Sequence, residues 1–185
     1  PLRHAQDTKM RGDYRFQNNQ LQPLAGLPPL NQVNGRLLLT ESTATAQDIV
    51  GRAFGGPLKV QGEYMRSTTG RTDATSAPDF TGNSWYVYGV WNLTGETWGY
   101  KAGVPTTPLP NNPESGMWQV GVRYDKTDLD DGPVLGGEQN NVTFGVNWYW
   151  RSNFKLAANY VRVNSTRRDI DDDPNIVEAR AQFYW

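Results

Sequence analysis

Residues 141–150 read Asn-Val-Thr-Phe-Gly-Val-Asn-Trp-Tyr-Trp. Every second side chain from Val142 to Trp150 is large and apolar, whereas Asn141, Thr143 and Asn147 lie between them. A period of two is the pattern of a β-strand whose two faces meet different surroundings. This segment therefore predicts a strand that separates an apolar surface from a polar one.

The same alternation recurs along much of the chain. It is found in residues 58–65, 85–93, 118–125, 154–161 and 177–185, and less regularly in 47–54, with 36–40 as an upstream extension. We count seven predicted strands and no helix. Because tight turns (55–57 and 151–153) alternate with longer connections, an antiparallel up-and-down meander is expected.

The predicted connections differ in length and character. Three of them, 66–82, 127–140 and 165–174, are polar and charged and are expected to be long loops. A fourth, 96–116, is rich in Pro and Gly. Residues 1–43 are expected to form an upstream loop or edge segment, and residues 44–185 the strands of the sheet.

The composition of the 185 residues excludes several classes of function. There is no Cys and only one His, His4, so disulfides, thiolate nucleophiles and multi-histidine sites are absent. Eighteen basic residues balance 19 acidic ones, which argues against nucleic acid as a partner. No catalytic constellation and no cofactor motif is found, so we expect neither an enzyme nor a cofactor.

Alternation alone fits either a soluble barrel with an apolar core or a membrane barrel with an apolar exterior. The aromatic side chains favour the membrane barrel, because Phe54, Trp91, Trp148, Trp150 and Trp185 gather at strand ends on one side. Outer-membrane barrels carry such girdles at the bilayer interface. An arginine that faces lipid near the midplane of the bilayer costs roughly 2–4 kcal/mol. The polar faces of the strands, which carry the arginines, are therefore expected to face a water-filled lumen.

Several stretches resemble one known family. They are Gly56-Pro57-Leu58-Lys59-Val60-Gln61-Gly62-Glu63-Tyr64-Met65, Leu93-Thr94-Gly95-Glu96, Val122-Arg123-Tyr124-Asp125, 139–149, Ala158-Asn159-Tyr160-Val161, 173–176 and 179–185. Together they resemble the C-terminal half of the phosphate-selective porins O and P. The resemblance implies a 16-stranded transmembrane barrel, of which this chain supplies seven or eight strands. The remaining strands are expected upstream or in a second chain.

The resemblance also implies a function: passive diffusion of phosphate, polyphosphate or other small anions through the outer membrane of a Gram-negative bacterium. It implies a homotrimer surrounded by outer-membrane lipids. By parity, Lys59, Arg123, Lys155 and Arg180 are the candidates to line the pore and bind anions. Two alternatives stay open: a general or blocked barrel with a structural or anchoring role, and a soluble ligand-binding barrel.

The end of the chain carries a second candidate site. Phe183 and Trp185 end the last apolar face, and this ending is similar to the signal that the barrel-assembly machinery binds. By parity Arg162 is expected at the outer interface, where it could snorkel. The acidic run at Asp169 and 171–173 is interpreted as a charged loop without a metal, and Glu63 with Glu178 is a catalytic pair only if the two prove adjacent.

Overall fold

The structure is a computed structural model that describes residues 9–22, 29–70, 79–101 and 104–185. Ten strands form one sheet, in the order β1-β2-β3-β4-β5-β8-β9-β10-β11, with β12 also paired to β10. The strands are β1 (Arg11–Leu21), β2 (Leu30–Thr40), β3 (Thr43–Ala53), β4 (Gly56–Thr69), β5 (Phe80–Asn92), β8 (Met117–Asp131), β9 (Val134–Trp150), β10 (Phe154–Arg167), β11 (Ile170–Asp172) and β12 (Asn175–Phe183).

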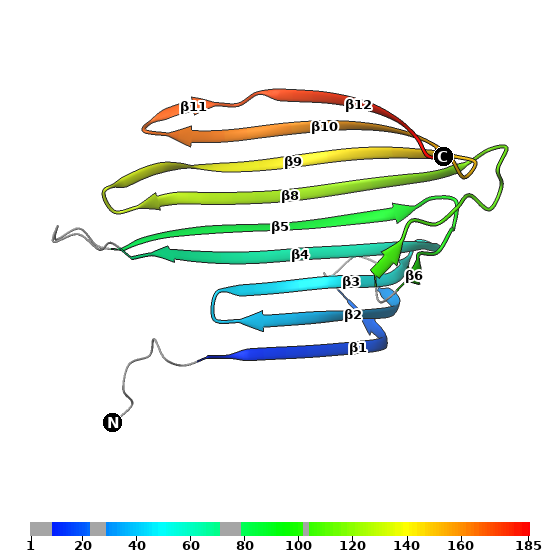
Figure 1. The fold of residues 1–185 in the computed structure, drawn as a ribbon, viewed down its shortest axis with the longest axis horizontal. Coiled ribbons are helices and arrows are strands. Elements are labelled where there is room, and N and C mark those ends of the chain that lie inside the picture. Colours follow the sequence, from blue (N-terminus) through cyan, green and yellow to red (C-terminus); the bar gives the residue numbers. More distant parts are fainter. Residues whose placement is uncertain (1–8, 23–28, 71–78, 102–103) are drawn as a thin grey trace.

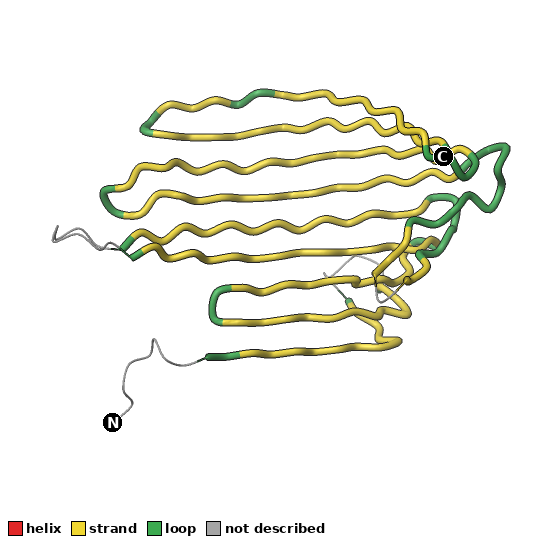
Figure 2. The backbone as a smooth tube through the Cα atoms, viewed as in Figure 1, coloured by secondary structure: helices red, strands yellow, loops and turns green. Residues whose placement is uncertain are grey.

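All pairings in this sheet are antiparallel, and the strands of the sheet follow one another in chain order, except that β12 pairs with β10 and not with β11. The predicted all-β, up-and-down fold is therefore confirmed. β11 and β12 lie along the same side of β10, with a break at Asp173-Pro174. Figure 1 shows the strands side by side in one row, and Figure 2 shows how little of the chain lies outside them. No helix is found in the described ranges, and hence none that could span a membrane.

One prediction about an individual strand was wrong. Residues 36–40 do not extend the strand at 47–54; they belong to β2, which turns back and pairs with β3. Residue Asp48 in β3 has a positive φ of 54°, at a shift in register between Ala46 and Ile49. A bulge of this kind breaks the period of two, which explains why the alternation in this region is poor.

The predicted long loops are mostly strand. β8 and β9 continue through 127–140 and are joined at Gly132-Pro133, and β10 continues to Arg167. Arg168 and Asp169 both have positive φ, as a two-residue hairpin turn requires. These strand ends lack apolar alternation because both of their faces are polar. The connection predicted at 66–82 is shorter in the structure and comprises residues 70–79, of which 71–78 lie outside the described residues. His4 also lies outside the described residues.

Direct partners on neighbouring strands point to the same side, so the register defines two faces. The apolar face carries two groups of aromatic side chains. The turn-end ring, beside the β9–β10 turn, consists of Phe54, Trp91, Trp118, Trp148, Trp150, Phe154 and Phe183. The loop-end ring, at the opposite end, consists of Tyr64, Trp85, Tyr124, Phe144 and Tyr160.

The spacing of the two rings is regular. Trp85 and Trp91, Trp118 and Tyr124, Phe144 and Trp150, and Phe154 and Tyr160 are each separated by six residues, an even number that keeps both members on one face. Six residues span about 20 Å of strand. Four consecutive strands thus carry an apolar segment of equal length between two aromatic side chains.

The loop-end ring also fixes the tilt of the strands. Tyr64 lies opposite Trp85, whereas Tyr124 lies opposite Val87, two residues nearer the turn end of β5. Tyr124 in turn lies opposite Val142, and Tyr160 lies opposite Phe144, again two residues nearer that end. A shift of two residues over two strands corresponds to a tilt of about 35°, using the usual rise and strand spacing. Transmembrane barrels have tilts of about this size.

Several buried residues lie at the turn end, within the 93–116 connection or next to it. Trp98 and Met117 are buried there, together with Asn92 and Glu96. The Glu96 carboxylate accepts hydrogen bonds from the Thr94 hydroxyl and from the backbone N–H of Asn111, the latter at 3.1 Å. This connection contains the short hairpin β6 (Gly99–Lys101) and β7 (Val104–Thr106).

Candidate functional site

The four candidate cations share the polar face. One row of direct partners, Lys59, Val90, Gly121, Gly145, Asn159 and Glu178, crosses the sheet from β4 to β12. Arg123 lies two residues from this row on β8, and Arg180 two residues from it on β12. Lys155 lies four residues from the row on β10. The register therefore places all four cations on the polar face, as the alternation of the sequence predicted.

Three of these cations lie over tyrosine rings. Arg123 Cζ lies 4.3 Å from the centroid of the Tyr86 ring, and Lys155 Nζ lies 4.8 Å from that of Tyr149. Lys59 Nζ lies 5.8 Å from the centroid of the Tyr88 ring. The face of an aromatic ring attracts a cation, so each contact holds the side chain against the wall. The Arg123 residue is exposed, whereas Lys59 and Lys155 are half-buried.

Hydrogen bonds fix two of these tyrosines. The Tyr88 hydroxyl donates to Gln61 Oε1 at 2.8 Å, and Gln61 Nε2 donates to the Tyr86 hydroxyl at 3.0 Å. The Tyr86 and Tyr88 rings are stacked, with 6.2 Å between their centroids. The tyrosines are therefore rigid supports for the cations above them.

The cations differ in how their charge is balanced. Arg123 Nε lies 3.2 Å from Asp125 Oδ2, and Asn141 Nδ2 donates to the other carboxylate oxygen at 2.7 Å. Within the described residues, no carboxylate lies within ion-pair distance of Lys59, Lys155 or Arg180. The positive charge of the polar face is thus least compensated toward the turn end, where both lysines lie.

A shallow hollow of about 220 Å³, lined by residues of β5, β8, β9 and β10, lies on this face. Gly121 and Gly145, which are direct partners, line it, and the side chains of Val90 and Asn159 lie beside them. Arg123, Thr143 and Asn159 also line it and offer hydrogen-bond donors. A small anion would find a guanidinium, a hydroxyl and an amide at this place.

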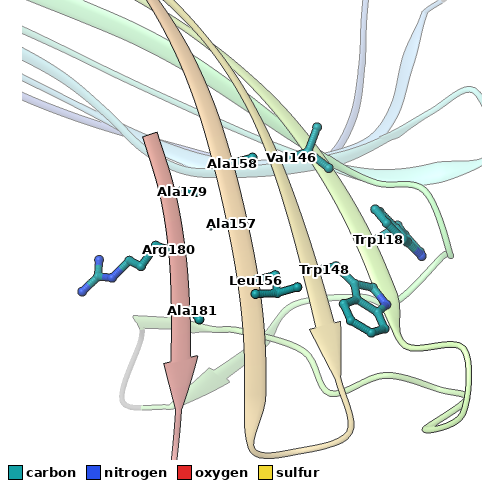
Figure 3. A pocket seen from close by; sticks show the side chains of 9 residues that line it. All are labelled: Trp118, Val146, Trp148, Leu156, Ala157, Ala158, Ala179, Arg180 and Ala181. Carbon is teal, nitrogen blue, oxygen red and sulfur yellow. The ribbon is translucent and has the colours of Figure 1, made fainter. Parts of the chain in front are cut away.

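Arg180 is in a different position from the other three cations. It lies on β12, the last strand of the sheet, opposite Ala157 of β10. Figure 3 shows its side chain pointing away from Trp148 and Leu156, which belong to the apolar face. That face has a groove of about 530 Å³ between β8 and β12, floored by Ala158, Ala179 and Ala181.

Polar side chains also meet at the turn end of the polar face. Asn147 Nδ2 donates to Gln119 Oε1 at 3.0 Å, and Gln119 Nε2 donates to Asn92 Oδ1 at 2.8 Å. Residues Thr107–Pro110 of the long connection lie near Tyr149 and Tyr184, around a cavity of about 330 Å³. The 93–116 connection therefore reaches over the turn-end edge of the polar face.

The two candidate assembly residues differ in their surroundings. Phe183 ends β12 and packs on Phe154, with 4.8 Å between ring centroids. Trp185 lies beyond the strand and its side chain is fully exposed. Phe183 thus completes the turn-end ring, whereas Trp185 extends past it.

Glu63 and Glu178, the two glutamates considered as a catalytic pair, are not adjacent. Glu63 is on β4 and Glu178 on β12, with four strands between them. Asp171 accepts a hydrogen bond from the Thr166 hydroxyl at 2.7 Å, which ties the acidic run to β10. The carboxylates that lie close together are instead Asp128, Asp130 and Glu138, and Glu138 is paired with Lys126 at 2.9 Å.

The structure reveals two features that the sequence analysis did not predict. One is the contact of the cations with Tyr86, Tyr88 and Tyr149. The alternation of the sequence indicates only that these tyrosines lie on the polar face. The other is the loop-end ring; the recurring spacing of six residues between aromatic side chains is the signal that could have revealed it.

Taken together, a tilted up-and-down sheet, two aromatic rings on its apolar face and a charged opposite face define the wall of a transmembrane β-barrel of the porin class. Residues 30–185 match the family described as phosphate-selective porin O and P. The chain belongs to that family.

Two relatives were compared with the chain. It is 29% identical over 144 residues to Porin O of Pseudomonas aeruginosa, covering 70% of this chain and 33% of that protein. It is 35% identical over 72 residues to an uncharacterized protein of Caulobacter vibrioides, covering 37% of this chain and 15% of that protein. The chain thus spans about a third or less of the length of these relatives.

Proposed function

We propose that the protein is an anion-selective porin of a Gram-negative outer membrane, in which this chain supplies the C-terminal part of a closed barrel. The polar face lines the lumen, and the apolar face contacts lipid. Phosphate or a related small anion passes through by diffusion. Family membership and the relative named Porin O support the class of function.

The observation that carries the proposed selectivity is the uncompensated charge of Lys59 and Lys155. Both ammonium groups lie against tyrosine rings and have no carboxylate partner in the described part of the chain. Such charges raise the local concentration of anions and lower that of cations. Several modest sites allow release, which a single tight site would prevent.

Arg123 supports the same function in a different way. Its charge is balanced by Asp125, yet its guanidinium lines the hollow above Gly121 and Gly145. An arginine can donate two parallel hydrogen bonds to a phosphate. We therefore assign Arg123 to recognition of the anion and the two lysines to attraction, with Arg180 as a further wall cation.

The test is the anion-to-cation permeability ratio of the full-length protein in planar bilayers, measured from reversal potentials in a salt gradient. The Lys59→Gln/Lys155→Gln double variant is expected to lower the ratio about fivefold, the effect of roughly 1 kcal/mol. The Lys59→Arg/Lys155→Arg variant keeps the charges and is expected to keep the ratio. An unchanged ratio in the glutamine variant would contradict the role of the lysines, and a folded wild-type barrel without conductance would favour the anchoring role.

A further inference from the structure

Three strands of the sheet share a pattern at the loop-end ring. β4, β8 and β10 run toward the loop end, and each carries a cation two residues beyond its ring tyrosine. The pairs are Tyr64 with Arg66, Tyr124 with Lys126, and Tyr160 with Arg162. Residues two apart on a strand point to the same side. The three cations therefore face outward, just past the aromatic ring.

These cations are accessible. Arg66 and Arg162 are exposed, and neither has an ion pair with any described residue. Lys126 is half-buried and is paired with Glu138 at 2.9 Å. At the edge of an apolar band, such long side chains reach toward the polar zone above it. The register confirms the outward parity expected for Arg162, which lies opposite Val142 of the apolar face.

The outward surface stays polar beyond the cations. Asn140, Asn164 and Thr166 line a cavity of about 390 Å³ there, together with Arg168 and the carboxylates of Asp130, Glu138 and Asp169. Amide, hydroxyl and carboxylate groups are partners for sugar hydroxyls. A phospholipid such as phosphatidylglycerol places only a small headgroup beyond its phosphate, whereas a glycolipid places larger sugar rings with more hydroxyls there.

We propose that Arg66, Lys126 and Arg162 bind the phosphate groups of a phosphorylated glycolipid whose sugars lie on the polar surface above and whose acyl chains lie on the apolar face below. The proposal rests on the membrane-facing assignment of the apolar face made under the proposed function. Guanidinium groups match phosphate geometry, and an ammonium adds a further charge. Three cations on alternate strands form an arc around the barrel wall that follows the tyrosines of the ring.

The test measures binding of lipid A, a phosphorylated and acylated disaccharide, to the full-length protein in detergent of constant composition. The Arg66→Gln/Arg162→Gln variant is expected to raise the dissociation constant about thirtyfold. Lys126→Gln is expected to have a smaller effect, because Glu138 already balances its charge. Dephosphorylated lipid A and phosphatidylglycerol are expected to bind more weakly than lipid A to the unchanged protein.

Two control variants keep the outcome interpretable. Arg66→Lys/Arg162→Lys retains both charges and is expected to bind lipid A within about threefold of the unchanged protein. Arg151→Gln removes a cation at the opposite end of the sheet and is expected to leave binding unchanged. If the glutamine variant forms a heat-modifiable barrel and binds lipid A normally, the proposal is wrong. Equal binding of dephosphorylated lipid A or of phosphatidylglycerol would overturn it too. Because these residues lie outside the lumen, the result does not depend on conductance.

Discussion

The guanidinium of Arg123 lies over the ring of Tyr86, with 4.3 Å between Cζ and the ring centroid. The same guanidinium pairs with Asp125 on its own strand. The Tyr86 ring and the Asp125 carboxylate therefore both hold Arg123 at the wall of the sheet. The negative charge of Asp125 partly cancels the electric field of the guanidinium. This arrangement predicts that the neighbouring carboxylate limits the anion preference of the channel.

Asp125→Asn is expected to raise the anion-to-cation permeability ratio of the full-length protein about twofold, the effect of roughly 0.4 kcal/mol. The substitution removes the negative charge and keeps the shape of the side chain. Asn141→Ala serves as the control, because it removes a hydrogen bond to Asp125 without a change of charge. A ratio that stays unchanged or falls in the Asp125→Asn channel would refute the assignment of this face to the lumen.

Trp148→Ala is expected to lower the free energy of unfolding by about 2–4 kcal/mol. Trp148 contacts Trp118, Trp150 and Phe154 in the turn-end ring, and each aromatic pair contributes about 0.5–1.5 kcal/mol. The measurement is reversible denaturant unfolding of the full-length barrel in lipid vesicles. Trp185→Ala, which removes a fully exposed ring, is expected to change stability by less than about 0.5 kcal/mol.

Deletion of Trp185 is expected to abolish assembly of the full-length protein in the outer membrane while leaving refolding in detergent intact. The exposed position of Trp185 suits recognition by another protein better than it suits packing. Heat-modifiable barrel in isolated outer membranes is the readout. Normal amounts of folded barrel in the deletion strain would count against an assembly signal.

The turn between β10 and β11 is expected on the cell surface, and the turn between β9 and β10 in the periplasm. Ile170→Cys and Ser152→Cys place single thiols at these two exposed sites. A membrane-impermeant maleimide added to whole cells is expected to label position 170 alone. Labelling of position 152 in intact cells, with 170 protected, would reverse the orientation.

Glu96→Ala is expected to destabilise the barrel by about 1–3 kcal/mol, because the Thr94 hydroxyl and the Asn111 N–H lose their acceptor in a buried place. Glu96→Gln keeps an amide oxygen and is expected to cost less. The free energy of unfolding gives the comparison. Equal losses in both variants would mean that charge, rather than hydrogen bonding, holds the 93–116 connection.

The alternation of side chains predicted the strands that cross the apolar band, because each of them has one apolar and one polar face. It could not predict the outer parts of β8 and β9, since Asp128 and Asn140 lie where both faces are polar. There the backbone ladder continues without a hydrophobic pattern. β1 and the first part of β2 were missed for a related reason: positive φ at Asn18 and Gln32, beside shifts in register, interrupts their period.

The candidate site was predictable only in part. Parity placed Lys59, Arg123, Lys155 and Arg180 on one face, and the register agrees. Whether a cation is balanced depends on its neighbours across strands and along its own strand. To predict that Lys155 has no carboxylate partner, one must know the register of β9, β10 and β12. A periodic pattern in the sequence does not contain this information. The role of each cation in conduction stays a prediction.

Within the described residues, β1 pairs only with β2, and β12 only with β10. Each of these strands thus has a row of N–H and C=O groups on its outer side without a strand beside it. In a hydrocarbon phase each N–H or C=O group without a hydrogen-bond partner costs several kcal/mol. This sheet therefore has no stable membrane-inserted state by itself. The two rims must be joined to other strands before or during insertion. A variant that slows that joining would therefore expose the whole chain to proteolysis, even if every contact within the sheet were intact.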